Sequence, residues 1–75
     1  MRQRLAGLDD MRAARRRRVI VAAIRVLGSR VEAEAWMARP AVAFGQVRPD
    51  EKLSTASEMR QLLDHLTRME FGVYT

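Results

Sequence analysis

Residues 19–32, VIVAAIRVLGSRVE, contain the end of one helix and the beginning of the next. The first half of this stretch is apolar on almost every side, and surrounding arginines and alanines favour a buried helix over a strand. Gly28 then supplies the residue that commonly closes a helix in a left-handed turn. Ser29 and Glu32 have the spacing of a capping box, in which the hydroxyl accepts from the amide three residues on. The stretch therefore predicts two helices joined by a tight turn.

Working outward, the pattern predicts a first helix over Asp9–Leu27, exposed at its start and buried by its end. A second helix over Arg30–Ala38 ends before Pro40, because a residue that precedes proline is displaced from the helical region. The residues of this second helix that we expect to face the core are Val31, Ala35 and Trp36.

The second half of the chain predicts a compact connector and one more long helix. We expect Phe44 and Val47 to anchor the connector, and residues 49–51 to form one helical turn that opens with proline. Thr55 and Glu58 repeat the capping-box spacing before a helix over Ala56–Phe71, which Gly72 ends. The residues that line its apolar face are Met59, Leu62, Leu63 and Leu66. The predicted fold is a small all-α domain with three main helices, one long and N-terminal, plus a short helical turn.

Composition limits the classes of protein that this chain can represent. It has 75 residues and no cysteine, which predicts one small domain without disulfides in a reducing, cytoplasmic setting. No apolar run approaches the ~18 residues that a membrane helix needs. The net charge of +5 is concentrated in residues 1–30, which hold nine arginines against two aspartates. This asymmetry predicts an anionic or acidic partner for the N-terminal third.

The basic cluster contains four consecutive arginines, residues 15–18, with Arg12 one turn earlier. Four consecutive helical residues cover about 300° of the helix surface, so they surround the helix instead of lining one side of it. A solvated or oligomer-facing segment is one interpretation, and contact with nucleic acid is the other. The residues for which we consider anion or nucleic-acid contact are Arg12, Arg15, Arg16, Arg17 and Arg18. No helix pair with a tight turn precedes them, so DNA reading by this chain alone is not expected.

The apolar end of the first helix predicts oligomerisation. Two short helices cannot cover a helix that is apolar all round, and exposed apolar surface of this kind marks interfaces. We therefore expect a homodimer or a higher oligomer. The residues assigned to that interface are Val19, Ile20, Ala23, Ile24 and Leu27.

Catalysis is poorly supported by the sequence. His65 is the only histidine, and Asp64 points about 100° away from it on the predicted helix, so the two do not form an oriented base pair. We interpret His65 as a solvated helix residue. The four glycines make no phosphate-binding pattern. We predict no catalytic residue, no cofactor and no metal site.

A set of ordered residues in the second half resembles a known family. The set begins with Trp36 and Pro40 and continues with an apolar–Gly step at residues 44–45. Pro49, Leu53 and Thr55 follow. The chain then ends on the pattern L-x-R-x-E-x-G-V, residues 66–73. Over residues 35–74 this order and spacing resemble the toxin-binding domain of Xre/MbcA/ParS-type antitoxins. Ala41 and Glu58 depart from the family pattern, where asparagine and glycine are common.

The resemblance implies a function in bacterial toxin–antitoxin systems. Its expected partner is a RES-domain toxin that consumes NAD, whose active-site cleft the C-terminal segment would block. Many such antitoxins carry an N-terminal helix-turn-helix domain, whereas this chain has room only for one long helix. We expect residues 1–28 to form a basic oligomerisation helix and residues 29–75 the toxin-binding domain. The residues assigned to toxin binding are Arg68, Phe71, Gly72, Val73, Tyr74, Thr75, Trp36 and Phe44.

Two alternatives stay open at this point. From physics alone, Phe71 and Tyr74 either fold back onto the core or wait for a pocket in a partner, where an aromatic anchor contributes much of the binding energy. The resemblance favours the second. The alternative function is a nucleic-acid-binding helical module, or an operon autorepressor, that uses Arg12–Arg18.

Overall fold

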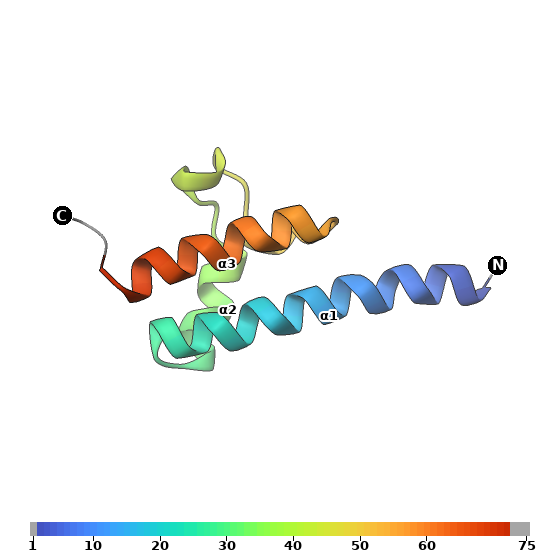
Figure 1. The fold of residues 1–75 in the computed structure, drawn as a ribbon, viewed down its shortest axis with the longest axis horizontal. Coiled ribbons are helices and arrows are strands. Elements are labelled where there is room, and N and C mark those ends of the chain that lie inside the picture. Colours follow the sequence, from blue (N-terminus) through green and yellow to red (C-terminus); the bar gives the residue numbers. More distant parts are fainter. Residues whose placement is uncertain (1, 73–75) are drawn as a thin grey trace.

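The computed structural model describes the backbone of residues 2–72 and the side chains of residues 10–72. Within this part, three α-helices follow one another with two 3-10 turns in the connector between the second and third (Figure 1). The elements are α1 (Arg2–Leu27), α2 (Arg30–Ala38), η1 (Val42–Phe44), η2 (Pro49–Glu51) and α3 (Ala56–Glu70). The only extended pairing among the described residues is an isolated bridge between Ala41 and Val47. The all-α prediction is confirmed.

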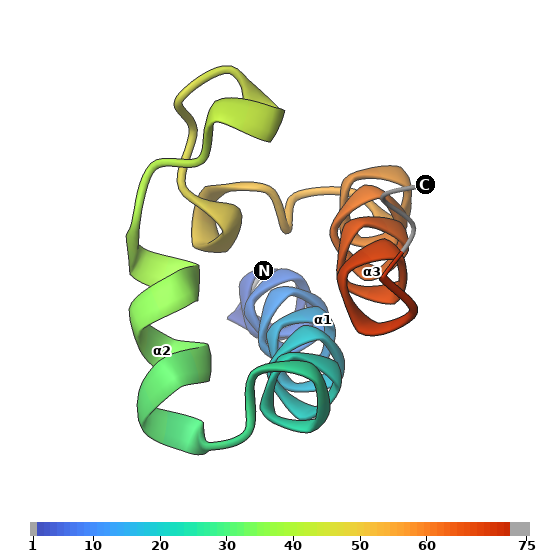
Figure 2. The same ribbon diagram turned by 90° about the vertical axis from the view of Figure 1, so that its left-hand side faces the viewer.

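The turn between α1 and α2 forms as the sequence predicts. Gly28 has a φ of 101°, and its amide donates to the carbonyl of Ile24 at 2.8 Å. The Ser29 hydroxyl accepts from the amide of Glu32 at 3.2 Å. A positive φ at Gly28 turns the chain sharply, so α2 crosses the side of α1 at a steep angle (Figure 2).

The two long helices differ from their predicted bounds. Since α1 begins at Arg2 instead of Asp9, residues 2–8 also belong to it. That segment is rich in helix-forming arginine, leucine and alanine, and no proline interrupts it. At the other end of the chain, α3 stops at Glu70, with Phe71 as its C-cap and Gly72 at a φ of 58°.

Thr55 caps α3 with a variation on the expected pattern. Its hydroxyl accepts from the amide of Glu58 at 3.1 Å, as predicted. The Glu58 carboxylate, however, accepts from the amide of Ser54 at 3.1 Å, one residue before the cap. Both bonds satisfy amides that the helix itself leaves unpaired, so the start of α3 is fixed.

One apolar core joins the three helices, with α1 in contact with both α2 and α3 (Figure 2). Its buried members are Val19, Ile20, Ala23, Ala33, Met37, Leu53, Leu62 and Leu66. The residues of 1–28 and 29–75 therefore contribute to the same core. Among the described residues, no helix is long and apolar enough to cross a membrane.

The inward face of α2 was predicted wrongly. Ala33 and Met37 are fully buried, whereas Val31 is 78% exposed and Ala35 and Trp36 are half-buried. Six of the nine residues of this helix are apolar, and the three charged ones all lie in its first half, so its periodicity does not specify one face. The position of Gly28 and the packing against α1 decide the rotation instead.

Candidate functional site

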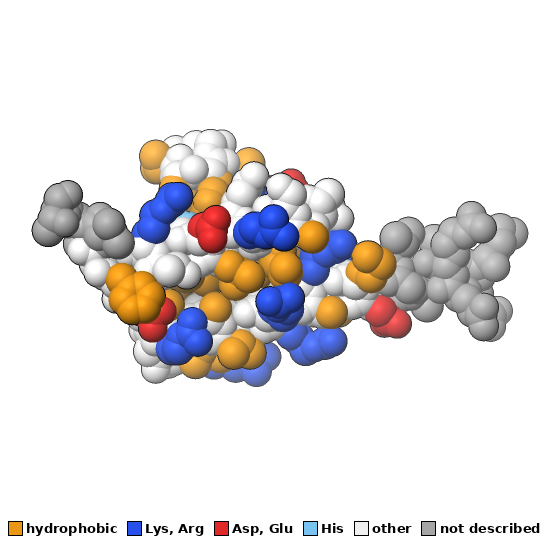
Figure 3. Space-filling model, viewed as in Figure 1, with side chains coloured by type: hydrophobic (Ala, Val, Ile, Leu, Met, Phe, Trp, Pro, Cys, Tyr) orange, Lys and Arg blue, Asp and Glu red, His pale blue; other side chains and the backbone are white. Residues whose placement is uncertain are grey.

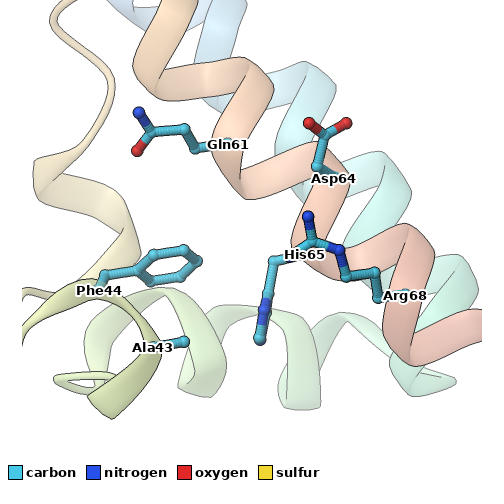
Figure 4. A pocket seen from close by; sticks show the side chains of 6 residues that line it. All are labelled: Ala43, Phe44, Gln61, Asp64, His65 and Arg68. Atoms are coloured by element: carbon cyan, nitrogen blue, oxygen red, sulfur yellow. The ribbon is translucent and has the colours of Figure 1, made fainter. Parts of the chain in front are cut away.

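A shallow pocket of about 250 Å³ lies between η1 and α3. Ala43 and Phe44 contribute from the connector, and they face four side chains along α3 (Figure 4). The side chains from α3 are Gln61, Asp64, His65 and Arg68. The pocket therefore has an aromatic wall and a rim with an amide, a carboxylate and a guanidinium.

His65 is half-buried between two aromatic rings. Its ring is stacked on Trp36 of α2, with centroids 6.5 Å apart and an interplanar angle of 10°. The ring of Phe44 meets it edge-on at 5.1 Å and 68°. On the Phe44 ring, the Lys52 ammonium lies 5.7 Å from the centroid, close enough for a cation–π contact.

The interpretation of His65 as a solvated residue was therefore wrong. The imidazole holds α3, α2 and the connector together, and it places Phe44 in the pocket wall. No local signal predicts this role, because Trp36 lies 29 positions earlier in the chain. Trp36, which we expected in the core, packs against the core while staying half-buried.

The predicted toxin-binding residues at the end of α3 are exposed. Phe71 is 72% exposed, and Gly72 is exposed next to it. Arg68 is exposed one turn earlier and makes no ion pair or hydrogen bond with another described residue. Val73, Tyr74 and Thr75 lie outside the described residues.

Three of the five candidate nucleic-acid contacts instead hold the fold together. Arg12 donates to the carbonyl of Asp50 at 3.0 Å. Arg15 donates to the carbonyls of Leu53 and Ser54, both at 3.0 Å. Each of these carbonyls lies in the segment that leads into α3.

Arg16 binds the carboxylate of Glu34, a residue of α2. Its Nη2 donates to Oε1 of Glu34 at 2.6 Å, in a half-exposed ion pair. This bond lowers the pKa of Glu34, and it raises the pKa of Arg16 above its usual value. Arg17 and Arg18, by contrast, are exposed and make no polar contact with other described residues.

A model of one known family matches the chain over residues 22–72. It describes the C-terminal toxin-binding domain of the antitoxins Xre, MbcA and ParS. The chain belongs to this family. Neither the curated proteins nor the solved structures include a match.

The matched antitoxin domain begins inside α1 and includes every buried residue of α2 and α3. It also contains the whole pocket and the exposed Phe71. The resemblance found in the sequence began at residue 35, so the match adds the last turns of α1 and the first half of α2. Those turns of α1 supply part of the surface on which α2 and α3 pack, and Val19 and Ile20, just before the match, supply the rest.

The antitoxin fold buries much of the predicted oligomerisation surface within a single chain. Val19, Ile20 and Ala23 are at most 5% exposed, because α2 and α3 cover them. Ile24 and Leu27 are half-buried against the same core. Three of the five residues therefore have no area left for a second copy, and the oligomeric state stays a prediction.

Proposed function

We propose that the chain is an antitoxin that binds and neutralises a RES-type, NAD-consuming toxin by occluding its active site with the C-terminal segment. The family match supports an antitoxin role. The observation that favours this mode of binding is Phe71, a large aromatic side chain that is 72% exposed where α3 ends. The proposal assigns no catalytic step to the chain.

The end of α3 has the properties of a projecting binding element. Gly72 adopts a left-handed φ of 58°, a conformation that ends a helix. Phe71 does not pack against the core, and burial in a concave site would remove most of its apolar surface from water. Single aromatic anchors of this kind contribute a large share of the binding energy at interfaces.

The pocket supports a second part of the same surface. Phe44 and Arg68 line it together, and Arg68 lies one turn before Phe71 on α3. We propose that Trp36 contributes indirectly, by holding His65 against Phe44. Toxin contact would then extend from the pocket to the C-terminal segment.

The test measures NAD loss caused by a RES toxin in the presence of this chain. We expect the full chain to inhibit the toxin and a version that ends at Glu70 to fail. Phe71→Ala should weaken inhibition by about 30-fold, the effect of losing one strong anchor. Val31→Ala is the matched control, because Val31 is 78% exposed on α2 and does not line the pocket.

Each outcome of this assay has a distinct meaning. Equal inhibition by the full and shortened chains would reject the C-terminal segment as the blocking element. Absence of both inhibition and complex formation would reject a RES toxin as the partner.

The alternative function, nucleic-acid binding, now rests on fewer residues. Arg17 and Arg18 remain available, while Arg12, Arg15 and Arg16 donate to groups of the same chain. Binding to DNA through two phosphates would lose about 0.9 log units per log unit of salt for each phosphate. A salt series with duplex DNA therefore separates this alternative from an apolar contact with a toxin.

A further inference from the structure

The helix pair α1–α3 has one side that α2 does not cover. Figures 1 and 2 place α2 on one side of this pair and leave the opposite side bare. Two ion pairs define these sides on α1. Arg16 binds Glu34 of α2 at 2.6 Å and marks the covered side, whereas Arg25 binds Glu70 of α3 at 3.5 Å and marks the bare one.

Helical rotation identifies which residues lie on the bare side. At about 100° per residue, positions 11, 18 and 22 of α1 lie about 20–60° from position 25, on the side that leads to Arg15 and its bonds to the start of α3. Positions 14 and 21 lie on the other side of position 25 and are not included. On α3, positions 59 and 63 lie within about 20° of position 70, and position 60 lies about 80° from it, on the side away from the buried Leu62 and Leu66. We call these positions the α1–α3 face. Its members are Met11, Arg18, Ala22, Arg25, Met59, Arg60, Leu63 and Glu70.

The middle of the α1–α3 face is apolar. Met11 is 51% exposed, and Ala22, Met59 and Leu63 are half-buried. Figure 3 shows hydrophobic side chains between α1 and α3, with basic side chains on both sides of them. An apolar strip with a polar rim is the composition of protein interfaces.

The rim of the face carries unbalanced positive charge. Arg18 on α1 and Arg60 on α3 are exposed, and neither pairs with another described residue. Arg25 already shares its charge with Glu70. A second copy of this chain would bring the same arginines against the first, and like charges across an interface are repulsive. The charge therefore favours a partner with acidic groups around an apolar centre.

We infer that the α1–α3 face docks a helix of the toxin, apolar along its middle and acidic along its flanks. This inference rests on the proposed function and adds a second contact to it. Two parallel helix surfaces with an apolar strip between them accept a third helix through ordinary side-chain packing. The acidic flanks would pair with Arg18 and Arg60.

The experiment compares two charge reversals of equal size in the full chain, with the C-terminal segment the same in every variant. The first variant is Arg18→Glu with Arg60→Glu on the α1–α3 face. The control is Arg30→Glu with Arg39→Glu, at the two ends of α2 and both exposed. Arg30 also pairs with Glu34 at 3.6 Å, so the control removes one ion pair more than the face variant does. Both double variants change the net charge by the same amount. Circular dichroism checks the helix content of each.

We expect the face variant to raise the dissociation constant of the toxin complex at least 10-fold at low salt, and the control less than 3-fold. Met11→Asp, which also adds negative charge to the strip, should weaken binding several-fold on its own. Face and control variants within 3-fold of each other would overturn the inference. Dissociation of a homodimer by the face variant, with toxin affinity unchanged, would assign the face to a second copy and overturn it as well.

The two proposals fail in different ways. If the full wild-type chain binds no RES toxin, the proposed function fails and this inference fails with it. If the wild-type chain binds and inhibits but the face variant binds equally well, only the docking inference fails.

Discussion

Two adjacent pairs of arginines on α1 have opposite roles. Arg15 and Arg16 point toward the connector and α2, where carbonyl oxygens and Glu34 accept their hydrogen bonds. Arg17 and Arg18 are exposed and make no polar contact with the rest of the described chain. Four identical residues in a row are thus divided by helix rotation alone, because each step turns the side chain by about 100°.

This difference shows that a basic run is not by itself evidence for an anionic ligand. Half of the run stabilises the fold, and only the other half is available to a partner. The covered side of α1 should therefore respond to mutation through stability, and the bare side through binding. The following predictions test this division.

The largest difference in the free energy of unfolding should be between substitution of a buried apolar residue and substitution of an exposed one. Leu62 is fully buried, and Leu62→Ala should lower the free energy of unfolding by about 2–5 kcal/mol, because it removes packing and leaves a cavity. Val21→Ala, on the exposed side of α1, should change it by less than about 0.5 kcal/mol. Urea denaturation followed by circular dichroism measures both. Similar losses from the two variants would show that the bare side is buried in an oligomer.

The next largest difference in unfolding free energy should be between substitutions of Arg15 and Arg17. Arg15→Met keeps much of the side-chain length but removes the donors to Leu53 and Ser54, so we expect a loss of about 1–2 kcal/mol in unfolding free energy. Arg17→Met removes the same charge without an internal partner and should cost less than about 0.5 kcal/mol. Urea midpoints compared at equal ionic strength are the readout. Equal effects would contradict the division of the run.

The start of α3 should show a smaller effect. Thr55→Ala removes the acceptor for the amide of Glu58 and should lower the unfolding free energy by about 1 kcal/mol. Ser57→Ala, inside the first turn and not a cap, is the control and should be close to neutral. Combining Thr55→Ala with Arg15→Met should give a non-additive loss of unfolding free energy, because both residues fix the segment that leads into α3. Strict additivity would show that cap and arginine act independently.

The smallest effect should be the pH dependence of the Arg16–Glu34 pair. Arg16 lowers the folded-state pKa of Glu34, so the carboxylate contributes stability above its unfolded-state pKa of about 4.5. That contribution is lost as the pH falls below this value through the folded-state pKa. Glu34→Gln should therefore reduce the drop in urea midpoint between pH 6 and pH 3. An unchanged drop would mean that the pair contributes nothing to the acid sensitivity.

The sequence predicted those parts of the fold that are determined locally. The turn at Gly28, the caps at Ser29 and Thr55 and the turn at residues 49–51 all depend on residues a few positions apart. Short-range chemistry also gave the bounds of α2 correctly. The family pattern identified the toxin-binding domain for the same reason, since it consists of residue types at fixed spacing.

What could not be predicted depends on contacts between distant residues. Arg15 and Leu53 are 38 positions apart, and Arg16 and Glu34 are 18 apart. His65 lies between rings from two other elements. Each of these roles follows from how the helices pack, which local spacing does not encode.

The length of α1 has a consequence for hydrodynamic measurements. Its 26 residues span about 39 Å, and its N-terminal part extends past the beginning of α3 (Figure 1). The radius of gyration is 13.1 Å, against about 11 Å for a compact domain of this length. An elongated monomer with extents of 50 × 24 × 18 Å diffuses more slowly than a sphere of the same 8.6 kDa. Elution volume alone would therefore overstate its mass, and light scattering is the measurement that can distinguish monomer from dimer.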